Sequence, residues 1–187
     1  EVTLAFHRLA IMDTTHAGDQ PFHSQQQSVW LMCNGEVYNY PELYQRYQAT
    51  YPFTSHSDCE VILPLYQELG IAETALQLDA EFALIIWDQQ LGKLFAARDP
   101  IGIRPLFYGY SAIDGKIMFA SEMKVLSALC STVHTFPPGH YYDGNGQFIS
   151  FRQISKVTEF NTDSQEKVLS EIRERLIEAV RKRLVAD

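Results

Sequence analysis

Short apolar segments separated by turn residues make up most of the sequence between residues 2 and 151. Turn signals containing Asn-Gly, Asp-Gly or a single Gly lie between pairs of these segments, and such residues favour the tight turns of β-hairpins. The predicted antiparallel pairs are 29–33 with 36–38, 84–87 with 93–98, 106–110 with 116–120, and 140–142 with 147–151. Residues 2–6 predict an additional opening strand.

Helical signals interrupt this pattern in three places. One helix is expected to follow Asn39 and run to about residue 47, and a third to cover residues 122–129. The second should begin at Ser57, with its hydroxyl as N-cap and Glu60 closing a capping box, and continue to residue 69. Pro64 should kink or stop it. Runs of hairpins and runs of helices favour an α+β fold in which helices cover antiparallel sheets.

The last thirty residues have a different pattern. Asp163 and Glu166 form an N-cap and capping-box pair, and apolar residues recur at helical spacing from 169 to 184. We therefore expect one domain over residues 1–155, and a linker with the first helix of a second domain over residues 156–187. The sequence opens at Glu1 without an initiator Met or a leader, so we expect that a beginning is missing.

Composition narrows the class of protein. The chain is 46% hydrophobic and 20% charged, and its longest apolar run, residues 82–87, is too short to span a bilayer. A formal charge of -8 makes nucleic acid a poor partner. Three widely spaced cysteines fit a reducing compartment, and we expect the cytoplasm.

Candidate chemistry lies where the predicted strands and helices end. The six histidines lack the spacing of a metal site, and neither a phosphate loop nor a serine nucleophile elbow is present. Arg8, the pair Asn34-Gly35 and Asp58 remain as candidates. Each also has a simple structural explanation, namely an exposed charge, a turn, and a favourable charge at a helix N-terminus.

Together these residues suit a free amino acid. A guanidinium binds an α-carboxylate, a carboxylate pairs with an α-ammonium, and an amide beside a backbone N–H can stabilise a tetrahedral oxyanion. On this interpretation the sequence supplies recognition and transition-state stabilisation but no nucleophile.

Several motifs occur in an order that points to one family. They are His7 to Ile11 (HRLAI), Gly18 to Pro21 (GDQP), Asn34 to Asn39 (NGEVYN), Ser57 to Ile62 (SDCEVI), Arg98 to Leu106 (RDPIGIRPL), Ala120 to Lys124 (ASEMK), and Pro137 to Gly139 before a Tyr pair. In this order they resemble the class II glutamine amidotransferase domain of glutamine-dependent asparagine synthetases over nearly the whole chain.

The resemblance implies a four-layer αββα N-terminal-nucleophile sandwich, truncated at its N-terminus. It also implies roles for particular residues: Arg8 for the glutamine α-carboxylate, Asp58 for the α-ammonium, Asn34 with the Gly35 N–H as the oxyanion hole, and Leu9, Ile11 and Glu36 as pocket wall and backbone contacts. The family's nucleophile is a first-residue cysteine that this chain lacks, so the fragment alone is expected to be inactive. Cys33 and Cys59 cannot replace it, because neither has a free α-amine.

The same resemblance sets the expected partners. Glutamine is the substrate, and released ammonia would reach an ATP- and Mg²⁺-using synthetase domain on the same polypeptide; no cofactor is expected in this segment, and a homodimer is left open. The alternatives are a non-catalytic scaffold packed on a synthetase domain, and a different class II amidotransferase. One departure stands out: Ala80 replaces a family glycine, and adds strain if that position needs a positive φ.

Overall fold

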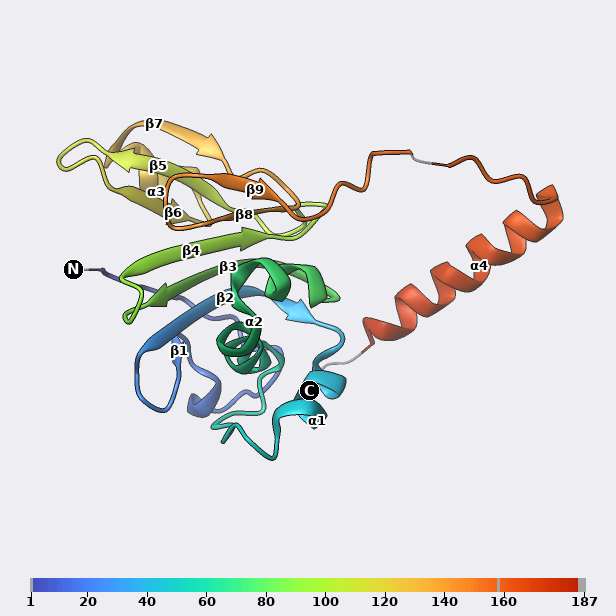
Figure 1. Ribbon diagram of the computed structural model, residues 1–187, viewed down its shortest axis with the longest axis horizontal. Coiled ribbons are helices and arrows are strands. Elements are labelled where there is room, and N and C mark those ends of the chain that lie inside the picture. Colours follow the sequence, from blue (N-terminus) through green and yellow to red (C-terminus); the bar gives the residue numbers. More distant parts are fainter. Residues whose placement is uncertain (1, 158, 185–187) are drawn as a thin grey trace.

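A computed structural model describes residues 2–157 and 159–184 (Figure 1). Within them, two antiparallel sheets are formed. The first has the order β1-β2-β3-β4-β8-β9, with bounds Phe22–His23, Val29–Val37, Ala80–Asp88, Lys93–Arg98, His140–Tyr142 and Phe148–Ser150. The second has the order β6-β5-β7, with bounds Ile117–Ala120, Phe107–Ser111 and Cys130–Thr135.

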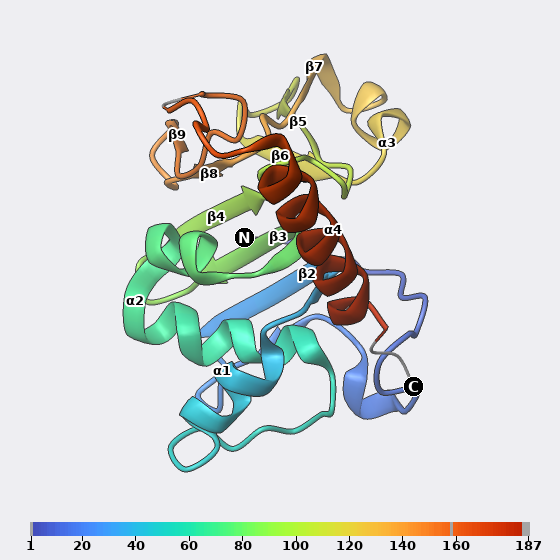
Figure 2. The same ribbon diagram turned by 90° about the vertical axis from the view of Figure 1, so that its right-hand side faces the viewer.

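Helices cover the outer faces of both sheets. Helix α2 (Ile62–Gln77) lies on the six-stranded sheet, and α1 (Tyr40–Tyr47) packs beside it and adds Leu43 and Tyr47 to the same core. Helix α3 (Met123–Ser127) packs on the three-stranded sheet (Figures 1 and 2). Two short 3-10 helices, η1 (His16–Gly18) and η2 (Asp58–Val61), precede β1 and α2. The predicted arrangement of helix, sheet, sheet and helix is therefore confirmed.

Strand β3 explains the longest apolar run of the sequence, because it is buried on both faces. Phe82, Leu84 and Ile86 belong to the core between α2 and the six-stranded sheet. Ala83 and Ile85 point the other way, into a second core between the two sheets. Residues from α2 and from both sheets thus meet around this strand.

Three of the four predicted hairpins are confirmed, and the fourth prediction is wrong. The turns at Gly92 and Gly115 and the Gly144–Gly146 turn have positive φ, as glycine allows. Asn34 and Gly35 instead lie inside the continuous strand β2, opposite Ala83 and Phe82 of β3. The Asn-Gly pair is therefore part of a strand, and the chain turns only after residue 37.

The helix predictions need local corrections. Ser57 does accept a bond from the Cys59 N–H, but it caps η2, and α2 follows from Ile62. Pro64 lies in the first turn of α2, where an N–H has no carbonyl of its own helix to reach, so it does not break the helix. The break is at Gly70, which has φ 73° and ψ 175°.

Three other local predictions are also wrong. Residues 2–10 form no strand, although Leu4 packs against the core between the sheets. The glutamate expected to close a capping box, Glu60, turns its carboxylate to Thr54 and Ser55. Ala80 does not have a positive φ, so the predicted strain is absent.

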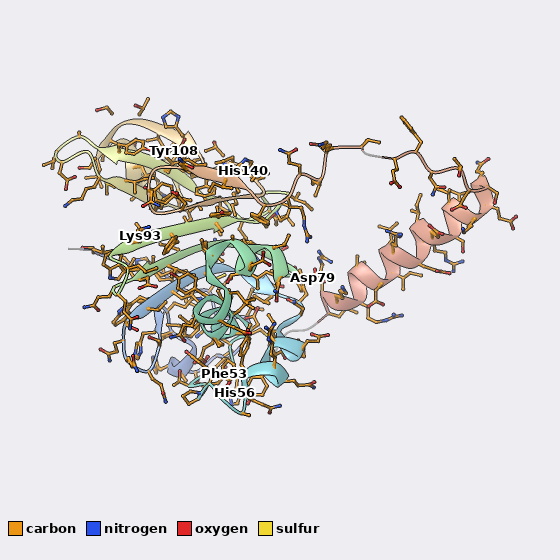
Figure 3. All side chains as sticks on the ribbon, in the orientation of Figure 1. Phe53, His56, Asp79, Lys93, Tyr108 and His140 are labelled. Carbon is orange, nitrogen blue, oxygen red and sulfur yellow. The ribbon has the colours of Figure 1, made fainter. Side chains whose placement is uncertain are left out.

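Helix α4 (Gln165–Lys182) stands apart from the sheets, after an irregular segment that follows β9 (Figure 1). Its N-cap is Ser164, one residue after the predicted Asp163, and no residue of the helix is buried. Its C-terminal end approaches the sheet: Lys182 Nζ lies 2.7 Å from Asp79 Oδ2, and Figure 3 shows Asp79 on the side facing this helix. The domain boundary at residue 155 stays a prediction.

Candidate functional site

The backbone of Gly35 faces the edge of β2 that lies away from β3. Its partner Phe82 uses both backbone groups on the β4 side, since the Asp99 N–H donates to the Phe82 carbonyl at 2.9 Å and the Phe82 N–H donates to Asp99 Oδ2 at 3.3 Å. Gly35 and Phe82 are therefore a non-hydrogen-bonded pair of the antiparallel ladder. Both polar groups of Gly35 must point to the opposite edge.

Three side chains occupy that edge around Gly35. The Gln20 amide bonds both backbone groups of Cys33, at 2.6 and 2.9 Å. The Asp58 carboxylate accepts from the Val37 N–H at 2.6 Å, and the Cys59 thiol lies 3.7 Å from the Gly35 carbonyl. Within the described part of the chain, the Gly35 N–H has no acceptor. It is a backbone donor in a gap between a side-chain amide and a carboxylate.

Crowding against β3 makes glycine obligatory at this position. A Cβ on residue 35 would lie 2.2 Å from the Glu81 carbonyl oxygen and 2.8 Å from the Phe82 Cα. The narrow spacing of a non-hydrogen-bonded pair is the cause. Gly35 is thus fixed by space, and its N–H direction is fixed by the ladder.

Asn34 and Glu36 face the other side of β2. Cys33 and Val37 are buried in the core under α2, while Met32 packs against the core between the sheets. Because side chains alternate along a strand, Asn34 and Glu36 share the face of Met32. The Asn34 side chain and the Gly35 N–H are therefore adjacent in the chain but leave the strand in different directions.

Asp58 lies beside a small cavity. The cavity is lined by Met12, Glu36, Val37, Tyr38, Tyr40 and Asp58. The space for water in it is about 10 Å³, which is about one water molecule. Burial raises the pKa of the Asp58 carboxyl, and hydrogen bonds from the Val37 and Cys59 N–H groups partly offset this. A buried carboxylate of this kind favours a cationic partner.

Arg8 is held by its own loop. Its guanidinium donates to the carbonyls of Met12, Asp13 and Thr15, and lies 3.4 Å from Asp19 Oδ1. It also rests on Gly18, where a Cβ would be 2.6 Å from Nη2. Both terminal nitrogens are therefore engaged, and binding a ligand carboxylate requires exchange of a loop carbonyl.

The remaining sequence candidates are placed around this loop. Leu9 is 86% exposed and Ile11 39% exposed, and neither lines the cavity, where Met12 lies instead. Asp58 and Glu36 do share it. The structure thus groups Asp58, Glu36 and the Gly35 edge, and connects Arg8 to them through the Met12 backbone. The roles of these residues stay predictions.

Arg104 is a site residue that the sequence did not single out. Its guanidinium lies 2.5 Å from Glu81 Oε1 and 3.6 Å from Glu36 Oε1. The loop before it is organised by buried Asp99, whose carboxylate accepts from the backbone N–H groups of four consecutive residues, 101–104, and by Arg98, which donates to three carbonyls. This loop is what presents Arg104 to Glu36.

The cysteines are poor nucleophiles in this arrangement. Cys33, Cys59 and Cys130 are all buried and free. A hydrogen-bonding contact with Cys33, together with burial, raises the pKa of the Cys59 thiol. A thiol kept protonated in the core is not activated for attack.

Comparison with known proteins decides the family. The sequence profile of the glutamine amidotransferase domain matches residues 1–138. The chain belongs to this family. The amidotransferase fold is also that of a glutamine phosphoribosylpyrophosphate amidotransferase from B. subtilis, with a TM-score of 0.61, 24% sequence identity, and coverage of 74% of this chain and 33% of that one. The predicted N-terminal-nucleophile sandwich is thereby confirmed.

Sequence relatives of this amidotransferase domain are glutamine-hydrolysing asparagine synthetases. A probable one from Schizosaccharomyces pombe is 40% identical over 100% of this chain and 34% of its own length. A probable one from Acanthamoeba polyphaga mimivirus is 38% identical over 100% and 37%, and asparagine synthetase B from Escherichia coli 37% over 98% and 33%. The chain spans about a third of these relatives, and is homologous to their amidotransferase part.

No helix in residues 2–157 and 159–184 combines the length and apolarity needed to cross a bilayer. The same residues hold no group of three or more His, Cys, Asp or Glu side chains arranged for a metal ion.

Proposed function

We propose that this chain binds L-glutamine at the β2 edge, as the glutamine-hydrolysing part of an asparagine synthetase. The single observation that carries the proposal is the Gly35 N–H, which lies on an edge closed on one side by Gln20 and on the other by Asp58. Asp58 would pair with the α-ammonium group, and Arg8 with the α-carboxylate. Membership of the amidotransferase family and the asparagine synthetase relatives support this substrate.

The chemistry assigned to the chain's own residues is electrostatic. Attack on the side-chain amide carbon places a negative charge on its oxygen, and the Gly35 N–H and the Asn34 amide would donate to it. Because the N–H is held by the strand, it needs no reorganisation during the reaction. The nucleophile is assigned to a cysteine outside residues 1–187, since the three within them are buried.

For the whole polypeptide we propose that the ammonia produced here is used by a synthetase domain to amidate aspartate with ATP and Mg²⁺. Support comes from the relatives, of which this chain covers 33–37%. We assign no cofactor to the present residues. Three free buried thiols also support a reducing compartment such as the cytoplasm.

The test uses the complete polypeptide that carries residues 1–187. Ammonia release from glutamine is expected, and Asp58→Asn should lower kcat/KM by about tenfold or more through loss of a charge-assisted contact. Asp114→Asn, a substitution in an exposed hairpin turn, is the matched control and should retain activity. Glutamine turnover that Asp58→Asn leaves unchanged would contradict the assigned site.

The two alternative functions, a non-catalytic scaffold and a different class II amidotransferase, predict other results in this assay. A complete polypeptide that neither binds nor hydrolyses glutamine is the scaffold module. One that hydrolyses glutamine but transfers nitrogen to an acceptor other than aspartate is a different amidotransferase. Sequence identity to asparagine synthetases over the whole chain favours the first proposal, because the likeness to the phosphoribosylpyrophosphate enzyme extends to the fold alone.

A further inference from the structure

Asp13 connects the two loops that carry Arg8 and Asp58, the residues proposed to bind glutamine. It is buried, with 4% of its surface exposed, and has a φ of 54°. Its backbone carbonyl accepts from the Arg8 guanidinium. Its side chain reaches 43 residues along the sequence, where Oδ2 accepts from the His56 N–H at 2.7 Å. One residue therefore touches both segments.

The far end of this connection leads directly to Asp58. His56 and Asp58 are separated only by Ser57, whose hydroxyl caps η2. The same segment is held on its other side by buried Glu60, which accepts from Ser55 at 2.6 and 2.8 Å. The Glu60 bonds are local to the segment. Among these contacts only that of Asp13 ties it to the loop of Arg8.

The carboxylate of Asp13 is itself held in place. Oδ1 accepts from the Thr15 hydroxyl at 2.6 Å and from the Thr15 N–H at 3.1 Å, leaving Oδ2 directed at His56. These bonds, with that of the Thr15 hydroxyl foremost, lower the pKa of the Asp13 carboxyl. The link is thus a fixed, charged acceptor that joins two loops lacking strand structure.

We propose that Asp13 is a positioning residue that sets the separation between Arg8 and Asp58, and so selects ligands with both an α-carboxylate and an α-ammonium group. The inference rests on the proposed function. In an α-amino acid the two charged groups are attached to one carbon, so their separation is constant, and both contacts form only if the protein groups are correctly spaced. Neither Arg8 nor Asp58 is on a strand, so the distance between them depends on bonds between the two loops.

The experiment compares three ligands on the complete polypeptide by isothermal titration calorimetry. They are L-glutamine, 4-carbamoylbutanoate, which lacks the amino group, and 4-aminobutanamide, which lacks the carboxylate. Asp13→Asn replaces one carboxylate oxygen with an N–H₂ group, which cannot accept a hydrogen bond. At least one of the bonds from the Thr15 hydroxyl, the Thr15 N–H and the His56 N–H is therefore lost. We expect the substitution to weaken glutamine binding about tenfold or more, the effect of losing one hydrogen bond to a charged group, and to change binding of either truncated ligand by less than about twofold.

Further variants separate positioning from general stability. Asp114→Asn, in the exposed hairpin turn, leaves the link between Asp13 and His56 intact, so glutamine binding should stay close to wild type. His56→Pro deletes the backbone donor of the link together with the imidazole, and His56→Ala, which keeps the N–H, is its control. The proline variant alone should reproduce the selective loss, even if Asp13→Asn fails to fold. A wild-type polypeptide that binds glutamine no better than the truncated ligands contradicts the proposed function. Normal glutamine selectivity in Asp13→Asn or in His56→Pro, or equal weakening of all three ligands, overturns the role of Asp13.

Discussion

Replacement of Gly35 by alanine tests the central geometry of the β2 edge. The added Cβ would meet the Glu81 carbonyl oxygen at 2.2 Å, the Phe82 Cα at 2.8 Å and the Phe82 Cβ at 3.0 Å. Two of these atoms are backbone, so no side-chain rotation relieves the contact. Strands β2 and β3 must separate locally, and the ladder bonds on either side of residue 35 must lengthen.

The expected cost follows from these contacts. Overpacking of a well-packed core costs roughly 1–3 kcal/mol, and weakening of two ladder hydrogen bonds adds about 1 kcal/mol each. We therefore expect Gly35→Ala to lower the free energy of unfolding by about 3–5 kcal/mol. For a domain of this size that corresponds to a fall in Tm on the order of 10 °C.

The measurement is thermal and urea unfolding of wild type beside Gly35→Ala and Gly92→Ala. Gly92 has a φ of +64°, and a Cβ added there would have no atom within 4 Å, so its substitution adds backbone strain without crowding. The loss of stability in Gly92→Ala should be about 1 kcal/mol. If Gly35→Ala is no more destabilising than Gly92→Ala, the crowded non-hydrogen-bonded pair is refuted.

Three further predictions concern charge and chemistry. Burial raises the pKa of Asp58 above 3.8, so its anionic form, which is the one that attracts an ammonium group, is lost on acidification sooner than that of an exposed aspartate. In the wild type, glutamine affinity measured by calorimetry should fall as the pH drops through that raised pKa, while in Asp58→Asn it should not change over the same pH range. If affinity depends on pH equally in both proteins, the contact between Asp58 and the α-ammonium group is refuted. Arg104→Met leaves Glu36 and Glu81 without their shared cation. It should lower the free energy of unfolding in urea by about 2 kcal/mol, with partial recovery in Arg104→Lys. Equal stability of wild type and Arg104→Met would show that the two ion pairs of Arg104 contribute nothing. A polypeptide of residues 1–187 alone should release no ammonia from glutamine, since its cysteines are buried, and turnover above that of its Arg8→Ala variant would contradict this.

The sequence pattern predicted those parts of the fold that depend on local geometry. The turns at Gly92 and Gly115 were predictable because a positive φ there suits glycine. Gly35 was misread as a turn, because a glycine required by crowding looks the same in the sequence as one required by φ. The difference lies in Glu81 and Phe82, which are 46 and 47 residues away and meet Gly35 only after β2 and β3 pair.

The site was predictable in composition but not in its hydrogen-bond connections. The polar types at Arg8, Asn34 and Asp58 indicated an amino-acid ligand, and the ordered motifs indicated the family. Nothing in the sequence showed that Arg8 would donate to loop carbonyls, or that Asp13 would reach His56. Such links join segments of irregular structure, which carry no periodicity from which a contact can be read.

The Gln20 side chain has a consequence for association between molecules. By donating to the Cys33 carbonyl and accepting from its N–H, one amide makes the bonds that a residue of a further strand would make. A bare strand edge invites pairing with another chain, which leads to aggregation. Gln20 blocks that docking position while leaving the next backbone donor within reach of something as small as an amino acid. The β2 edge can thus leave the Gly35 N–H accessible to a small ligand while preventing a strand of another molecule from pairing there.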